Sequence, residues 1–128
     1  MIDALEGFAL VYIYRPKKLV RSVTELPLFR DSINVARMKN GCYLALKLAP
    51  GNHRLHTGDP NRGYFVDLEP GCVYYFRAGL ETWSSKGRME LENAEKAVPE
   101  IQKLKFAEPG QILDVVSVID LPALPSKP

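Results

Sequence analysis

Apolar residues recur at every second position along most of the chain, and turn-forming residues interrupt them at short intervals. This period of two is typical of β-strands. Residues 8–15 are apolar on both faces and indicate a central strand. In residues 42–48, Leu44, Leu46 and Leu48 face one way and the residues between them face the other. Further strands are predicted at 28–30 and 33–38 (two strands, or one bent strand), 52–57, 64–68, 72–78 and 88–92.

Gly-containing turns separate these strands. Asn-Gly at 40–41 lies between two apolar runs and predicts a hairpin, because both central residues of a type I′ turn need positive φ. Pro-Gly at 50–51 and at 70–71 each follow one strand and precede another. Residues 41–51 and 63–71 therefore form a weak internal repeat. It predicts two hairpins of a meander, because two copies are too few for a solenoid.

The apolar spacing becomes helical towards the end of the chain, at Ala94, Ala97, Val98, Ile101 and Leu104. We predict one helix near residues 95–105. Pro99 is tolerated if the helix begins near Glu95 or Lys96, because the first turn needs no intrahelical N–H. Short strands and one late helix together predict a mainly β fold, an antiparallel β-sandwich with the helix packed at one edge.

We divide the chain into a β-sandwich domain at residues 1–108, which the helix closes, and a C-terminal extension at 109–128. The extension holds a β-prone segment at 112–119, followed by a proline-rich tail. This segment is either the last strand of the same sandwich or a strand that adds to the sheet edge of a neighbouring subunit.

Composition narrows the possible partners. A chain of 128 residues with 46% hydrophobic and 25% charged residues supports one packed core and excludes wholesale disorder. The net charge of +2 is too small to indicate nucleic acid as the main partner. No apolar run reaches the roughly 18 residues of a transmembrane helix. The first residues lack the features of a signal peptide, which predicts a cytoplasmic protein if the chain is complete as given.

The cysteines and histidines give no catalytic or metal motif. Cys42 and Cys72 each begin a strand, and three chain reversals separate them, so a meander places them at opposite ends. About 20 Å would then separate two residues whose Cα atoms must approach within about 7 Å to form a disulfide. We predict two free thiols. His53 and His56 point to opposite faces of one strand and cannot easily share a metal, which leaves both with structural or solvent roles. We predict no catalytic residues, no metal and no cofactor.

Aromatic and arginine side chains are the main candidates for binding, because they anchor interfaces and stack on sugars or peptides. The candidate ligand-binding residues are Arg15, Tyr75, Arg77 and Trp83. Two structural interpretations compete with this one. Alternate tyrosines fill the core of a sandwich, and the two arginines pair with carboxylates at the rim of a sheet.

Four motifs occur in order along the chain: Val11-Tyr12-Ile13-Tyr14-Arg15, Asn40-Gly41-Cys42-Tyr43, Pro50-Gly51-Asn52-His53 and Pro70-Gly71-Cys72-Val73-Tyr74-Tyr75. Together they resemble the pattern of a family of small bacterial envelope proteins of unknown function, many of them lipoproteins. The resemblance covers roughly residues 8–106. It implies an immunoglobulin- or prealbumin-like sandwich and a periplasmic or other envelope location, and it implies no reaction. The chain departs from the pattern because it lacks a signal and a lipid-attachment cysteine, and because it continues past the helix.

The leading hypothesis is a non-catalytic binding or assembly module of bacterial envelope type. Its partner would be another protein or a second copy, bound through a sheet edge or the C-terminal tail. The alternative is a carbohydrate- or small-ligand-binding sandwich that uses Trp83 and the tyrosines as stacking platforms. A small hydrolase built on a cysteine and a histidine is the last alternative.

Overall fold

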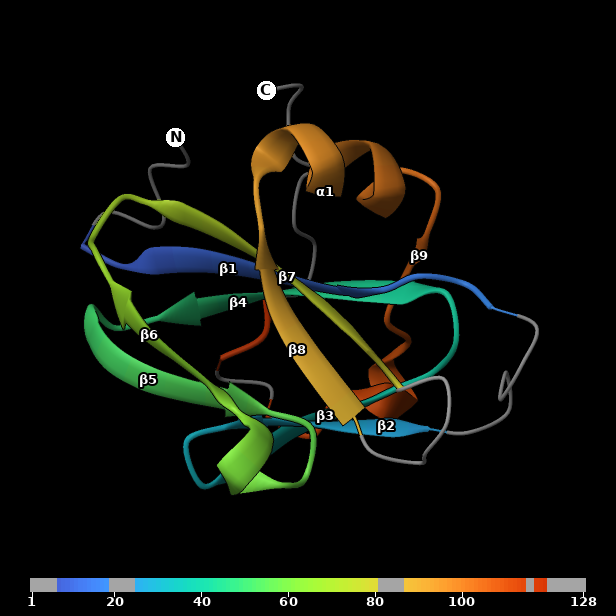
Figure 1. Ribbon diagram of the computed structural model, residues 1–128, viewed down its shortest axis with the longest axis horizontal. Helices are drawn as coiled ribbons and strands as arrows, with labels where there is room; N and C mark the ends of the chain where they lie inside the picture. Colours follow the sequence, from blue (N-terminus) through green and yellow to red (C-terminus); the bar gives the residue numbers. More distant parts are fainter. Residues whose placement is uncertain (1–6, 19–24, 81–86, 115–116, 120–128) are drawn as a thin grey trace.

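The computed structural model describes residues 7–18, 25–80, 87–114 and 117–119. These residues form two sheets packed face to face, with one helix lying on the outer face of the larger sheet (Figure 1). The predicted mainly β sandwich with a single helix is confirmed, but the helix packs on a sheet face and not at one edge, as was predicted. The larger sheet is mixed, however, because two of its strand pairs are parallel.

The larger sheet has five strands in the order β8-β7-β1-β4-β9. Their bounds are Ala9–Arg15 (β1), Cys42–Leu48 (β4), Val73–Leu80 (β7), Gly87–Glu92 (β8) and Lys105–Phe106 (β9). β1 runs antiparallel to β4 and parallel to β7. All seven residues of β1 are buried, which confirms the prediction of a central strand.

The smaller sheet has four antiparallel strands in the order β3-β2-β5-β6. Their bounds are Leu26–Arg30 (β2), Ile33–Met38 (β3), Gly51–His56 (β5) and Tyr64–Leu68 (β6). β2 and β3 are two strands joined by a tight turn and not one bent strand. Asp31 in this turn has a φ of 57°, a conformation that few residues other than glycine adopt.

The predicted hairpins at the three Gly-containing turns are wrong. Asn-Gly at 40–41 leads from β3 to β4, and Pro-Gly at 50–51 and 70–71 leads from β4 to β5 and from β6 to β7. In each case the two strands belong to different sheets, so the chain crosses the sandwich there. Only Gly41 of the first pair has positive φ, which excludes a type I′ turn.

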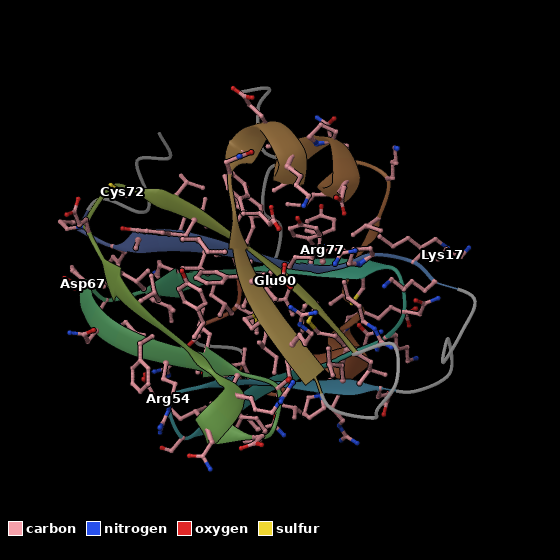
Figure 2. All side chains as sticks on the ribbon, in the orientation of Figure 1. Lys17, Arg54, Asp67, Cys72, Arg77 and Glu90 are labelled. Carbon is pink, nitrogen blue, oxygen red and sulfur yellow. The ribbon has the colours of Figure 1, made fainter. Side chains whose placement is uncertain are left out.

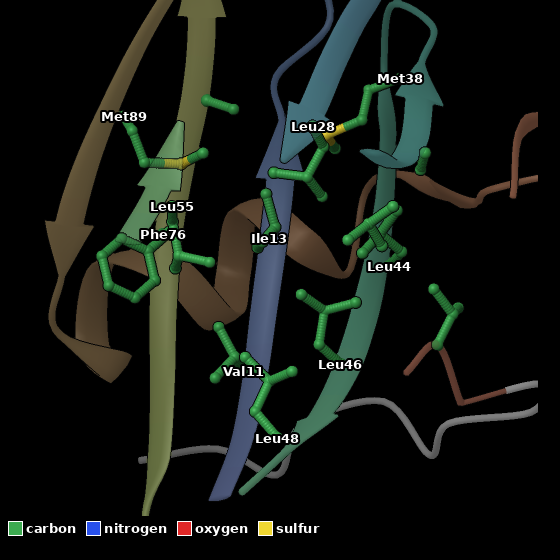
Figure 3. Close-up of a cluster of buried hydrophobic side chains, with 14 of the residues drawn as sticks. Val11, Ile13, Leu28, Met38, Leu44, Leu46, Leu48, Leu55, Phe76 and Met89 are labelled. Carbon is green, nitrogen blue, oxygen red and sulfur yellow. The ribbon is translucent and has the colours of Figure 1, made fainter. Parts of the chain in front are cut away.

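Two apolar clusters hold the layers together. The main core lies between the sheets, where Val11, Ile13 and Phe76 of the larger sheet meet Leu28 and Leu55 of the smaller one (Figure 3). A second cluster lies on the outer face of the larger sheet, beneath the helix. Burying each large apolar side chain contributes about 1.5–3 kcal/mol, so both faces of the larger sheet stabilise the fold.

The helix α1, Ala94–Ile101, is shorter than predicted and begins earlier. Asn93 caps it, because its side-chain oxygen accepts a hydrogen bond of 2.9 Å from the Lys96 N–H. Pro99 therefore lies inside the helix. The prediction that it lies in the first turn is wrong, because the helix begins at Ala94. Ala97 and Ile101 pack on the larger sheet.

The β-prone segment at 112–119 does not form a continuous strand in its described residues. It contacts its own domain through two isolated bridges, Ala36 with Ile112 and Leu46 with Val118. The segment thus touches β3 of the smaller sheet and β4 of the larger one. The predicted tail after residue 119 lies outside the described residues.

Candidate functional site

The four candidate ligand-binding residues do not form one site. Tyr75 and Arg77 share the outer face of the larger sheet, because they alternate on β7 with the core residue Phe76. Arg15 lies at the end of β1 on the opposite face from its neighbour Tyr14. Trp83 lies outside the described residues.

Arg15 is a buried structural residue. Its exposed fraction is 4%, and its Nη1 donates a 2.6 Å hydrogen bond to the carbonyl of Met38. Burial lowers the pKa of the guanidinium, because desolvation disfavours the charged form. The side chain therefore ties the end of β1 to β3 across the sandwich and offers little surface to a ligand.

Four tyrosines form a layer between the larger sheet and α1. This tyrosine layer consists of Tyr12, Tyr14, Tyr43 and Tyr75. The rings of Tyr12 and Tyr75 stack with centroids 5.5 Å apart. Burial raises the pKa of Tyr12 to about 12, and the neighbouring tyrosines add to the shift. These contacts favour a packing role, although the core they fill lies beneath the helix and not between the sheets.

Arg77 lies among carboxylates beside this layer (Figure 2). Its Nε is 3.8 Å from Oε2 of Glu100 on α1, and its cross-strand neighbour on β8 is Glu90. Arg77 therefore pairs with a carboxylate as expected, but over the outer face of the larger sheet and not at its rim.

The hydroxyl of Tyr14, the neighbour of Arg77 on β1, is fully buried. It has no hydrogen-bond partner among the described residues. Burial raises its pKa, with further contributions from nearby glutamates that outweigh the opposing charge of Arg77.

Both histidines are within hydrogen-bond distance of Asp31, an arrangement that the sequence did not predict. His53 Nδ1 lies 2.9 Å from Oδ2 of Asp31, and its Nε2 lies 2.8 Å from the carbonyl of Ala49. Both ring nitrogens thus face acceptors, and only the doubly protonated imidazolium donates to both. His56 differs, because its Nε2 faces the Asp31 carbonyl while its Nδ1 accepts from the Gly58 N–H. In that geometry Nδ1 of His56 is an acceptor and Nε2 is the donor.

The Asp31 carboxylate is held in its charged form by this arrangement. Burial alone would raise its pKa, but hydrogen bonds from the Arg54 N–H and His53, with the charges of His53 and Arg30, lower it. The turn between β2 and β3, with its unusual backbone at Asp31, is therefore fixed to β5 by polar contacts. Both histidines serve this structure.

The two cysteines are free thiols, as predicted. Cys42 pairs with Arg15 at one end of β1, and the carbonyl of Cys72 accepts from the Leu10 N–H at the other. They are thus at opposite ends, although the meander that led to this expectation does not exist. Burial raises the pKa of the Cys42 thiol to about 11, so it is protonated at neutral pH. Within the described ranges, no group of three or more His, Cys, Asp or Glu side chains could hold a metal ion.

The sheet edges differ in how they are protected. β4 is covered by β9 and by residues 117–119, and β3 receives hydrogen bonds from residues 113–114. β8 carries three charged side chains at its edge, Arg88, Glu90 and Glu92. Charge, bulges and covering segments are the usual means of blocking edge-to-edge pairing.

β6 lacks these protections in the described structure. It ends the smaller sheet, pairs with β5 in an unbroken register and contains no proline. Its single charged side chain is Asp67. Phe65 points outward and is 67% exposed, more than any other large hydrophobic side chain among the described residues. The exposed position of Phe65 was predictable from the sequence, because alternation along the strand assigns this aromatic residue to the solvent face.

In the part of the chain that the structure describes, the fold is a small β-sandwich with a helix over one face and an unprotected edge at β6. The chain belongs to the family described as "Protein of unknown function (DUF2846)", whose model matches residues 5–90, more than half of the chain. A search of curated proteins and a search of solved structures each found no match. Among the described residues, the single helix falls short of the length and apolar character needed to cross a bilayer.

Proposed function

We propose that this domain is a non-catalytic binding or assembly module of the bacterial envelope, and that it binds a protein partner at the edge of β6. The observation that carries the proposal is an edge strand that no other described residue covers, combined with the exposed ring of Phe65. An exposed sheet edge binds extended segments by main-chain hydrogen bonds, and outward side chains give the contact its specificity. The envelope location is supported by the resemblance of the four ordered motifs.

The chemistry of the described residues also favours binding over hydrolysis. The Cys42 thiol is buried and neutral at physiological pH, whereas a nucleophilic cysteine needs a lowered pKa. Both histidines are engaged by hydrogen bonds at Asp31, which leaves neither as an obvious base. These features argue against a mechanism that uses Cys42 with either histidine.

The carbohydrate-binding alternative is less well supported. Stacking on a sugar needs an exposed ring face. Tyr12, Tyr14 and Tyr43 are 0–5% exposed beneath α1, and the ring of Tyr75 stacks on Tyr12. Trp83, the other stacking platform of that alternative, lies outside the described residues, so the described tyrosines favour protein binding at the edge of β6.

Site-specific photo-crosslinking tests this proposal. A photoreactive phenylalanine analogue at position 65 is expected to give a discrete adduct with a protein in living bacteria. The same analogue at position 113 is the control, because Leu113 is also exposed, at 43%, but lies beside β3. Fractionation of the adduct between envelope and cytoplasm tests the location. Loss of any position-specific adduct, or an adduct found in the cytoplasm, would contradict the corresponding part of the proposal.

A further inference from the structure

The outer face of β5 and β6 carries a charge arrangement beside the unprotected edge. Arg54 of β5 is the cross-strand neighbour of Phe65, and its guanidinium carbon lies 5.5 Å from the centre of that ring. Asp67 is the next outward residue along β6. Figure 2 shows both charged side chains on this side of the sandwich. The Nε of Arg54 is buried and has no hydrogen-bond partner among the described residues.

Symmetry restricts how one β6 strand can pair with another. In an antiparallel pair around a two-fold axis, one residue lies opposite itself, and opposed residues share a face. An axis at Val66 overlaps all five residues of the strand and puts the outward Phe65 opposite Asp67 of the other copy. An axis at Asp67 would oppose two like charges, which is unfavourable.

The register centred on Val66 also brings opposite charges of the two copies close to each other. Directly opposed side chains have Cβ atoms about 5 Å apart, so Asp67 of one copy lies beside Phe65 of the other. The guanidinium of Arg54 already lies over that ring. Each carboxylate therefore approaches one guanidinium of the opposite copy, and the symmetry creates this contact twice.

We infer that the partner at this edge is a second copy of the chain, which pairs β6 with β6 antiparallel about an axis through Val66. Two four-stranded sheets then become one continuous eight-stranded sheet. This inference rests on the proposed function and names its partner. The contact is reversible, because strand addition over five residues gives an interface at the small end of the range.

A charge-reversal experiment on the full-length chain tests the pairing. Arg54→Asp gives residues 54 and 67 the same negative charge at both contacts, and Asp67→Arg gives them the same positive charge, so each substitution replaces attraction by repulsion. We expect sedimentation equilibrium to show a monomer–dimer equilibrium for the unchanged chain and monomers for each variant. An equimolar mixture of the two variants should regain the dimer, because both contacts then join opposite charges. Arg37→Asp is the matched control, since this exposed arginine lies on β3 at the opposite edge of the same sheet.

Each outcome decides the inference. A regained dimer in the mixture supports the stated register and also excludes misfolding, because complementation needs two folded chains. A monomer at every concentration of the unchanged chain would overturn the inference, as would a dimer that survives either reversal or a mixture that stays monomeric. The crosslinking experiment at position 65 tests the proposed function separately. A position-65 adduct with a different protein would retain edge binding while excluding a second copy.

Discussion

Replacing Tyr14 by phenylalanine should make the protein more stable. The change removes one oxygen and leaves the ring in the tyrosine layer. That oxygen is fully buried and has no hydrogen-bond partner among the described residues. A buried hydroxyl without a partner costs about 2 kcal/mol relative to its hydrated state, whereas the small void left by its removal costs about 1 kcal/mol. The free energy of unfolding should therefore rise by about 1 kcal/mol.

Urea denaturation at neutral pH measures this change. The midpoint should move to higher urea with an unchanged slope, and the melting temperature should rise by about 4 °C. The matched control is Tyr74→Phe, because the Tyr74 hydroxyl accepts a 2.9 Å hydrogen bond from the Glu69 N–H. That variant should lose about 1 kcal/mol. The two substitutions remove the same atom and are expected to act in opposite directions.

A Tyr14→Phe protein less stable than the unchanged protein by 1 kcal/mol or more would refute this reasoning. Such a result would mean that the hydroxyl is hydrogen-bonded in solution. The raised pKa of Tyr14 gives a second check, because the hydroxyl stays neutral and the gain should be the same at pH 6 and pH 9.

Three further outcomes follow from local contacts. Because the folded-state pKa of Asp31 lies below 3.8, its stabilising contribution is present above that value and is lost as pH falls through the folded pKa. Asp31→Asn should flatten the loss of stability below about pH 4 in denaturation curves, and parallel curves would contradict this. Asn93→Ala should reduce stability by about 1 kcal/mol in urea, while Asn93→Asp keeps the helix cap and most of the stability. At pH 8 an alkylating reagent should modify the partly exposed Cys72 before the buried Cys42, as peptide mass analysis can show, and equal rates would exclude protection of Cys42.

The strands were predictable from the sequence because their pattern is local. The alternation of Leu44, Leu46 and Leu48 identifies a strand whatever it pairs with, and these side chains do lie in the main core. The sequence was less informative about which strands pair with one another. Gly41 reverses the chain, but a reversal leads equally well to the same sheet or the opposite one. Long-range burial makes that choice, and it placed β3 and β4 in different sheets.

The candidate binding residues show the same division between local and long-range information. Alternation along the predicted strand at 72–78 is enough to put Tyr75 and Arg77 on one face, and the structure has them there. It could not show that a helix from residues 94–101 covers this face. Nor could it join Asp31 to His53, since their contact depends on the pairing of β2 with β5. The edge position of β6 is a property of the complete sheet and became visible only there.

The place of β1 has a consequence for how the chain folds during synthesis. β1 is made before its two neighbours, and its residues Leu10 and Val11 pair in parallel with Val73 and Tyr74. The smaller sheet is complete once residue 68 exists, so it forms from earlier and more local contacts than the larger one. Closing long loops slows folding, and an unpaired apolar strand promotes aggregation. β1 is thus enclosed only after both later strands are made, and a nascent chain must keep it from other molecules until β7 has emerged.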